Sequence, residues 1–130
     1  MGERFLIDTN AAIDYLAGKL PENGVNEIER ILVDKVGVIS IIVKIELLSF
    51  SPPNPEDLQI IEALVNQCTL IDLDEDIAEK TYLLRREHRI KLPDAIIAAT
   101  ALANQFTLIT RNTTDFRNIN GLTFINLYEL

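Results

Sequence analysis

The chain has 130 residues, of which 48% are hydrophobic and 25% charged, as expected for one compact domain over residues 1–130 with a genuine core. Its net charge of −8 argues against a protein that coats nucleic acid non-specifically through Lys and Arg, but it does not exclude a nuclease. No apolar run has the roughly 18 residues of a membrane span, the N-terminus is too short of apolar residues for a signal peptide, and the single cysteine allows no internal disulfide, so a cytoplasmic location is expected.

Segments typical of buried strands alternate with segments of helical periodicity along the whole chain. The first strand is expected at residues 4–8, and Thr9 and Asn10 supply capping chemistry for a helix that ends at Gly18. The later elements, in chain order, are a helix through Ile28 and Leu32, a strand at 36–39, a helix at 41–50 capped by Ser40, a helix at 56–66, a strand at 69–73, a helix at 76–87 capped by Asp74, a helix that has Pro93 as its first residue and reaches Asn104, a strand at 107–110, a helical turn at 113–116 and a strand at 122–127.

This alternation predicts an α/β fold with a mainly parallel central sheet and helices on both faces, a three-layer α/β/α sandwich. The strands are short and almost entirely apolar, as expected when both faces of a sheet are covered. The proline-rich segment 51–55 is interpreted as a turn between helices rather than as a linker between domains.

Acidic residues occur at four places where a buried carboxylate would be costly. Asp8 closes an apolar run, Glu46 interrupts one, Asp94 opens one, and Asp115 follows the fourth strand. In an open α/β sheet, ligands bind beyond the carboxyl ends of the strands, where loops and helix starts gather. The acids are therefore expected to meet at one edge of the sheet.

Each acid also has a purely structural interpretation. Asp8 could be a turn residue or a helix cap, and Asp94 is favoured at a helix N-terminus by the helix dipole. Asp115 could belong to an exposed turn. Glu46 is harder to explain in this way, because Ile42 and Phe50 at helical spacing place it on an apolar stripe.

A cluster of carboxylates requires protons or cations between its members. Two carboxylates about 4 Å apart repel each other by roughly 4 kcal/mol at an effective dielectric constant near 20. Oxygen ligands without paired His or Cys favour Mg²⁺ or Mn²⁺ over zinc, and these ions activate water and neutralise charge at a phosphodiester.

The segments around the four acids resemble a known family, the PIN domain ribonucleases, and within it the VapC-type toxins of bacterial toxin–antitoxin pairs. The segments occur in family order over nearly the whole chain, and they are Phe5-Leu6-Ile7-Asp8-Thr9-Asn10, Val43-Lys44-Ile45-Glu46-Leu47-Leu48, Leu92-Pro93-Asp94-Ala95-Ile96-Ile97-Ala98-Ala99-Thr100-Ala101, and Leu108-Ile109-Thr110-Arg111-Asn112-Thr113-Thr114-Asp115-Phe116.

The resemblance implies a Mg²⁺- or Mn²⁺-dependent endoribonuclease in which Asp8 and Asp94 are the principal metal ligands and Glu46 completes the acidic pocket. The fourth position departs from the family pattern, because Asn112 stands where many relatives have an acid and Asp115 lies three residues later. Thr9, Asn10 and Thr110 would contact metal, water or phosphate. The resemblance also implies a homodimer and a cognate antitoxin that covers the pocket with a basic side chain.

A basic run at residues 85–91 precedes the helix that bears Asp94. Its simple interpretation is a helix end whose cations interact with the dipole. Next to an acidic pocket, Arg85 and Arg86 are instead predicted to bind RNA and lead its backbone past the carboxylates.

Two rival functions follow from the same residues. An aspartyl-phosphate phosphotransfer domain also carries acids at strand ends, but it usually needs a second acid beside the first, where this chain has Thr9 and Asn10. The other rival is a catalytically degenerate PIN domain that acts as a protein or RNA interaction module.

Overall fold

The computed structural model describes residues 2–130 of the chain. Within this range the strands are β1 (Phe5–Ile7), β2 (Gly37–Ser40), β3 (Thr69–Ile71), β4 (Thr107–Ile109) and β5 (Phe124–Ile125). The helices are α1 (Thr9–Leu16), α2 (Glu22–Val33), α3 (Ile41–Leu48), α4 (Pro55–Gln67), α5 (Glu75–Glu87), α6 (Leu92–Asn104) and α7 (Thr113–Phe116).

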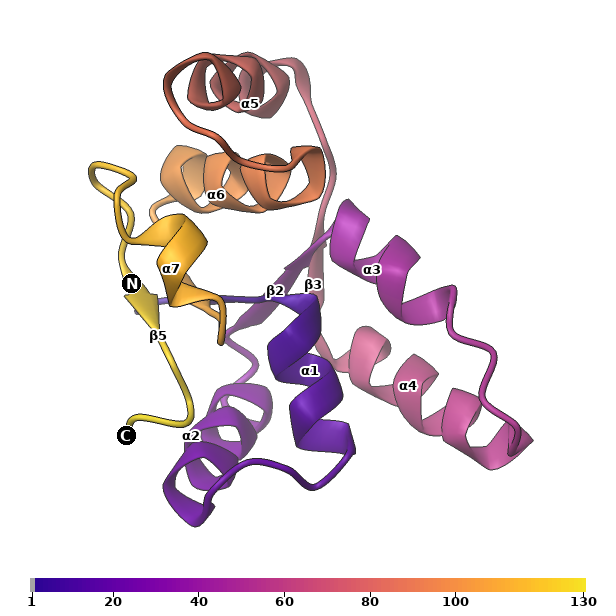
Figure 1. Cartoon of the computed structure of the whole chain (residues 1–130). Coiled ribbons are helices and arrows are strands. Elements are labelled where there is room, and N and C mark those ends of the chain that lie inside the picture. Colours follow the sequence, from indigo (N-terminus) through magenta and orange to yellow (C-terminus); the bar gives the residue numbers. More distant parts are fainter. Residues whose placement is uncertain (1) are drawn as a thin grey trace.

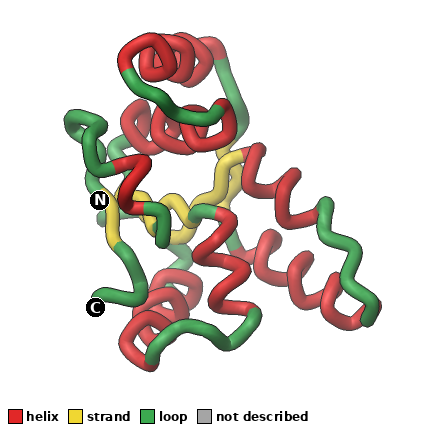
Figure 2. Tube along the Cα trace, viewed as in Figure 1, coloured by secondary structure: helices red, strands yellow, loops and turns green. Residues whose placement is uncertain are grey.

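The strands form one sheet of order β3-β2-β1-β4-β5, in which every neighbouring pair is parallel. Helices α5 and α6 lie on one side of the sheet, and α1 and α2 lie on the other (Figure 1). Figure 2 shows the strands enclosed by helices, which agrees with the complete burial of β1, β2 and β4. The expected α/β/α fold with a parallel sheet is therefore confirmed.

Strand order explains why the site lies where it does. β1 is the central strand, and Leu6 pairs in register with Val38 of β2 and Leu108 of β4. Because all three strands are parallel, their carboxyl ends meet at one edge, where Asp8 follows β1, Ser40 ends β2 and Thr110 follows β4. Helices α1 and α3 begin at this edge, each capped by a side chain from the strand end.

Several expected boundaries are wrong by one to three residues. β1 ends at Ile7, and Asp8, whose backbone amide still donates to the carbonyl of Ile109 at 2.9 Å, caps α1 with its carboxylate. Ser40 both ends β2 and caps α3, with its hydroxyl 3.2 Å from the amide nitrogen of Ile42. Pro93 is the second residue of α6 rather than the first, and β5 covers only residues 124–125.

The second helix also begins earlier than its apolar pattern indicates. α2 starts at Glu22, with Pro21 in the cap position, and includes Gly24. A Cβ atom at Gly24 would lie 2.4 Å from the carbonyl oxygen of Leu127, so the missing side chain lets α2 approach the C-terminal segment closely. None of the helices in the described part of the chain has the length and apolar character needed to cross a lipid bilayer.

Candidate active site

Asp8 lies at the centre of a hydrogen-bond network at the end of β1. Its carboxylate is buried, with 4% of the residue exposed. Oδ1 accepts a hydrogen bond of 2.8 Å from the amide of Thr9, which caps α1. Oδ2 accepts one of 2.8 Å from the hydroxyl of Thr110 and one of 3.1 Å from the side-chain amide of Asn10. Asp8 therefore caps α1 with one carboxylate oxygen and binds Thr110 and Asn10 with the other.

Burial raises the pKa of Asp8 above its ordinary value, and the negative charge of Glu46 adds to this effect. The hydrogen bonds from Thr110, Thr9 and Asn10 act in the opposite direction, because they stabilise the ionised form. Burial outweighs these donors. The protein environment therefore makes ionisation of Asp8 less favourable than it is in water.

Asp94 lies in the first turn of α6 and is half-buried. Its pKa is raised to about 6, first of all by burial. The negative charges of Asp8, Asp115 and Glu46 then raise it in that order, and Lys91 opposes them. Since all three carboxylates act on Asp94, the fold brings the four predicted acids within electrostatic reach of one another.

Glu46 approaches the cluster from α3. Its Oε1 atom accepts a hydrogen bond of 2.7 Å from the hydroxyl of Thr9, so the first turn of α1 holds the carboxylate. The prediction that Glu46 lies on an apolar stripe of its helix is only partly correct. Phe50 lies beyond the end of α3 and is 47% exposed, because the helix stops at Leu48.

Asp115 and Asn112, the two candidates for the fourth acidic position, are hydrogen-bonded to each other. The side-chain amide of Asn112 donates a hydrogen bond of 2.8 Å to Oδ2 of Asp115, while its backbone amide donates one of 3.0 Å to Oγ1 of Thr110. Asp115 lies in the short helix α7 and is exposed. The acid provides the charge that acts on Asp94, and the asparagine orients that acid.

The donor set fits a hard divalent cation, because the four acids offer carboxylate oxygens and carry mutually repelling charge. Over residues 2–130, no three His, Cys, Asp or Glu side chains already converge closely enough to count as a ready-made metal group. The four acids therefore lie within electrostatic reach of one another without forming a closed coordination shell among the described residues.

A second buried acid, Asp14, was missed by the sequence argument. It lies in α1, is 3% exposed, and accepts hydrogen bonds at Oδ2 from Arg111 (2.9 Å) and from the hydroxyl of Tyr128 (3.0 Å). The available signal was the same as for Glu46, an acid flanked by apolar residues in a helix. Its partners could not be identified, since they lie about one hundred residues away in sequence.

The predicted RNA-binding arginines lie at the end of α5. The guanidinium of Arg86 is 5.0 Å from the ring centre of Tyr82, and Nε of Arg85 is 3.4 Å from the carbonyl oxygen of Ile90. Both arginines are exposed. Lys91, at the end of the same basic run, is the residue whose charge acts on Asp94.

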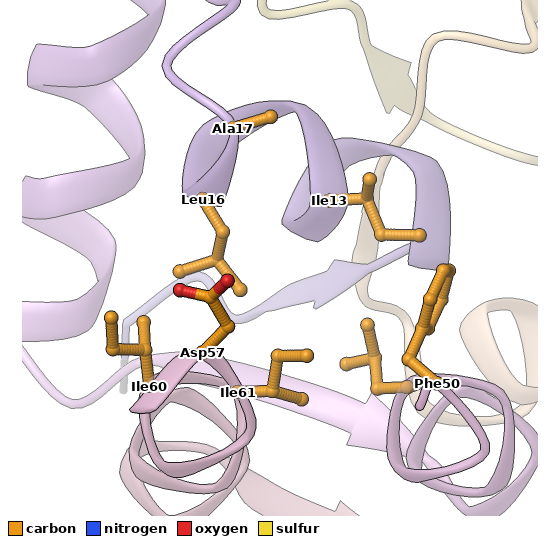
Figure 3. Close-up of a pocket in the computed structure, with 8 residues that line it drawn as sticks. Ile13, Leu16, Ala17, Phe50, Asp57, Ile60 and Ile61 are labelled. Carbon is orange, nitrogen blue, oxygen red and sulfur yellow. The ribbon is translucent and has the colours of Figure 1, made fainter. Parts of the chain in front are cut away.

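An apolar groove adjoins the acidic pocket between α1, α3 and α4. Ile13 of α1 faces Phe50, and Ile60 and Ile61 of α4 line the other wall (Figure 3). Asp57 places a carboxylate at the end near Leu16 (Figure 3). A neighbouring hollow shares Ile13 and Phe50 and continues to Thr9 and Glu46, so the groove leads to the acids.

Comparison with known proteins identifies the fold independently. The family model for the PIN domain matches residues 5–122. A toxin–antitoxin complex from Klebsiella pneumoniae contains a chain that is 35% identical, with 96% of this chain and 98% of that one covered and a TM-score of 0.75. VapBC2 from Rickettsia felis, bound to a DNA fragment from its promoter, matches at 25% identity, 94% and 97% coverage and a TM-score of 0.80.

DNA-bound VapBC from Salmonella typhimurium matches at 24% identity, with 97% of this chain and 99% of that chain covered and a TM-score of 0.82. At this identity the likeness concerns the fold. Comparison with curated proteins gives no match. The family and structural matches confirm the resemblance that the four acidic segments indicate.

Proposed function

Because the chain belongs to the PIN domain family, we propose that residues 1–130 form one nuclease domain that hydrolyses RNA phosphodiester bonds in a Mg²⁺- or Mn²⁺-dependent reaction, as the toxin of a toxin–antitoxin pair. The observation that carries the proposal is the convergence of Asp8, Glu46 and Asp115 on Asp94, where Thr9, Thr110 and Asn112 hold the three surrounding acids and where burial and their charges raise the pKa of Asp94 to about 6. A pocket of this kind is stabilised when a divalent cation enters it. A cytoplasmic location follows from the proposed substrate.

Asp8 and Asp94 are the proposed metal ligands, with Glu46 as the third acid. A divalent cation bound there supplies neutralisation of phosphate charge and a lowered pKa for water. Asp8 needs little rearrangement, since Thr9, Thr110 and Asn10 already fix both of its oxygens.

Glu46 and Asp115 are the proposed water-orienting acids. Thr9 fixes the carboxylate of Glu46, and Asn112 fixes that of Asp115, each through one hydrogen bond. A carboxylate held in this way can accept a proton from water placed between it and the scissile phosphate. Thr110 and Asn10 act as donors that keep Asp8 ionised while the pocket is occupied.

Binding of RNA to an acidic protein requires local positive charge. The positive charge of Lys91 acts on Asp94 and lowers its pKa. Arg85 and Arg86 add positive charge at the end of α5. We propose that Arg85 contacts the RNA backbone and offsets its repulsion from the carboxylates. Arg86, which the sequence also predicts to bind RNA, is assigned instead to the dimer contact described below.

The groove between α1, α3 and α4 is the proposed docking site of the antitoxin. Its apolar walls suit the apolar face of a partner segment, and its acidic ends suit a partner cation, at Asp57 on one side and Glu46 on the other. The similar structures of the Klebsiella pneumoniae toxin–antitoxin complex and of Rickettsia felis VapBC2 support a partner of this class.

A homodimer is proposed on the outer face of α5. Tyr82 and Leu83 are 50% and 41% exposed there, and Figure 1 shows no element beyond this helix. Glu79 lies one turn before them and Arg86 one turn after them. Two antiparallel copies of α5 would pair Glu79 with the partner's Arg86, twice in a symmetric contact.

The proposal is tested with purified wild type and Asp94→Asn on a mixture of cellular RNAs, with Mn²⁺ or Mg²⁺ added after dialysis against chelator. Wild type is expected to produce defined new RNA ends that mapping can identify, and the variant to produce none. Cleavage that persists in chelator or in the variant would contradict it. RNA binding without cleavage by the wild type would favour the interaction module, and labelling of Asp8 by a phosphoryl donor would favour phosphotransfer.

A further inference from the structure

Hydrogen bonds among Asp14, Arg111 and Tyr128, together called the clasp, connect the C-terminal segment to the residues around Asp8. Oδ2 of the buried Asp14 accepts from Nη1 of Arg111 at 2.9 Å and from the hydroxyl of Tyr128 at 3.0 Å. The three residues come from α1, from the loop after β4, and from the end of the chain. Asp14 thus ties together three segments that are distant in sequence.

Arg111 carries this connection to Asp8. Its backbone amide donates a hydrogen bond of 3.0 Å to Oδ1 of Asn10. That contact turns the amide nitrogen of Asn10 toward Asp8, whose Oδ2 lies 3.1 Å away. The opposite amide orientation would direct an oxygen at the carboxylate and lose both bonds. The position of Arg111 therefore determines that Asn10 acts as a donor to Asp8.

The same loop positions the other donor to Asp8. Thr110 directly precedes Arg111, and its hydroxyl donates to Oδ2 of Asp8 at 2.8 Å while accepting from the backbone amide of Asn112 at 3.0 Å. A displacement of Arg111 would move both neighbours. Asp14, in contrast, has no hydrogen bond to the acids of the pocket within residues 2–130.

The C-terminal segment is well placed to hold the clasp. The backbone amide of Thr110 donates to the carbonyl of Ile125 at 3.0 Å, and Leu127 packs directly over Gly24 of α2. The side-chain amide of Asn23 donates to the carbonyl of Leu130 at 3.1 Å. Tyr128 is thereby fixed on both sides, although 37% of it is exposed.

We propose that Tyr128, Asp14 and Arg111 are positioning residues for the metal pocket, through which the C-terminal segment sets the geometry of Asn10, Thr110 and Asp8. The proposal rests on the proposed function in one respect, the assignment of Asp8 as a metal ligand. Groups that orient a metal ligand without touching the ion typically contribute a factor of about 10 to 100 in metal affinity or activity.

The test measures Mn²⁺ affinity by calorimetry for Tyr128→Phe, Arg111→Ala and Asp14→Asn, at a temperature where circular dichroism shows each variant folded. The matched controls are Tyr15→Phe, which removes a hydroxyl that donates to Glu29, and Arg117→Ala, whose exposed side chain makes no hydrogen bond or ion pair within residues 2–130. Weakening of about tenfold in Arg111→Ala is expected, with a smaller loss in Tyr128→Phe and none in the controls. Affinities within twofold of wild type in Tyr128→Phe and Arg111→Ala would overturn the proposal.

A second readout uses the metal-free protein and separates this inference from the function. The side-chain amide resonances of Asn10 are expected to shift in Tyr128→Phe and Arg111→Ala, because the amide orientation depends on the clasp. A wild type that binds no Mn²⁺ would contradict the proposed function, but the Asn10 resonances would still test whether Tyr128 and Arg111 position Asn10. Unchanged Asn10 resonances in both variants would overturn that positioning role. Tyr128→Phe removes only one hydroxyl, so it provides a result even if Asp14→Asn fails to fold.

Discussion

The hydroxyl of Thr9 lies 2.7 Å from Oε1 of Glu46 and joins the first turn of α1 to the middle of α3. Thr9 follows the buried Asp8 directly, so one short segment controls two acids of the pocket. The backbone amide of Thr9 binds Asp8, and its side chain binds Glu46. The relative position of these carboxylates therefore depends on one capping bond within α1 and one bond between α1 and α3.

Thr9→Val is expected to reduce RNA cleavage with little change in fold, because valine keeps the shape and the backbone amide but removes the donor to Glu46. A loss of about tenfold in kcat corresponds to about 1.4 kcal/mol of lost positioning. Single-turnover kinetics would measure it. Thr9→Ser retains the hydroxyl and should recover most of the activity. Equal rates for the valine variant and wild type would remove Thr9 from the site.

Asp94→Asn is expected to stabilise the metal-free protein at neutral pH. The pKa of Asp94 is raised to about 6 in the folded state, so the folded protein binds the proton more tightly than the unfolded chain does. Stability contributed by this group is therefore lost as pH rises from about 4 to about 6. Allowing for partial exposure of the carboxylate, the variant should gain on the order of 1 kcal/mol, or about 2–5 °C in Tm.

The stability that Asp94→Asn gains over wild type should be present at neutral pH and disappear at acidic pH. Thermal melts in chelator at pH 7.5 should show the higher Tm for Asp94→Asn, and melts at pH 4 should show no such advantage, since both forms of the site are then neutral. Glu62→Gln, at an exposed position of α4 without a hydrogen bond or ion pair in the described part of the chain, is the control for a general effect of charge. A variant that is less stable than wild type at pH 7.5 would contradict the repulsion argument.

Metal affinity is expected to rise with pH through the same range. A cation binds the ionised carboxylates, so protonation of Asp94 below pH about 6 competes with it. Calorimetry of Mn²⁺ binding between pH 5 and 8 should show an increase that levels off above about 7. Asp94→Asn should bind weakly at every pH in this range. A wild-type affinity that is independent of pH would exclude Asp94 as a ligand.

The parts of this structure that depend on local sequence were predictable. The caps at Ser40 and Asp74 and the alternation of strands and helices follow from residue type and periodicity, and they led to the correct fold class. The meeting of the acids at one edge followed from parallel strands. These features need no knowledge of which side chains touch.

The pairing of particular side chains was not predictable. The bond between Asp14 and Arg111 joins residues 97 apart in sequence, and its existence depends on the exact packing of the loop after β4. Phe50 was misplaced because helix α3 ends two residues before it, and nothing in its apolar pattern indicates that end. The hydrogen bond between Asn112 and Asp115 was not predictable either, because it depends on the turn of α7.

Arg85→Ala is expected to weaken RNA binding and flatten its salt dependence without a change in Mn²⁺ affinity. Loss of one phosphate contact should reduce the slope of log K against log salt by about 0.7 for single-stranded RNA. Filter binding or fluorescence anisotropy of Asp94→Asn, which does not cleave, would measure this at several salt concentrations. Arg30→Ala, on the distant helix α2, is the matched control. An unchanged slope would assign Arg85 a structural role through its contact with Ile90.

Charge reversal on α5 is expected to dissociate the homodimer and then restore it. Glu79→Arg places two like charges opposite each other in the antiparallel contact, and Arg86→Glu does the same with the opposite sign. Each single variant should raise the dimer Kd at least about tenfold in sedimentation equilibrium, equivalent to about 1.4 kcal/mol. The double variant keeps the pairing with the signs exchanged and should dimerise like wild type. A double variant that remains monomeric while wild type dimerises would place the dimer contact on another face.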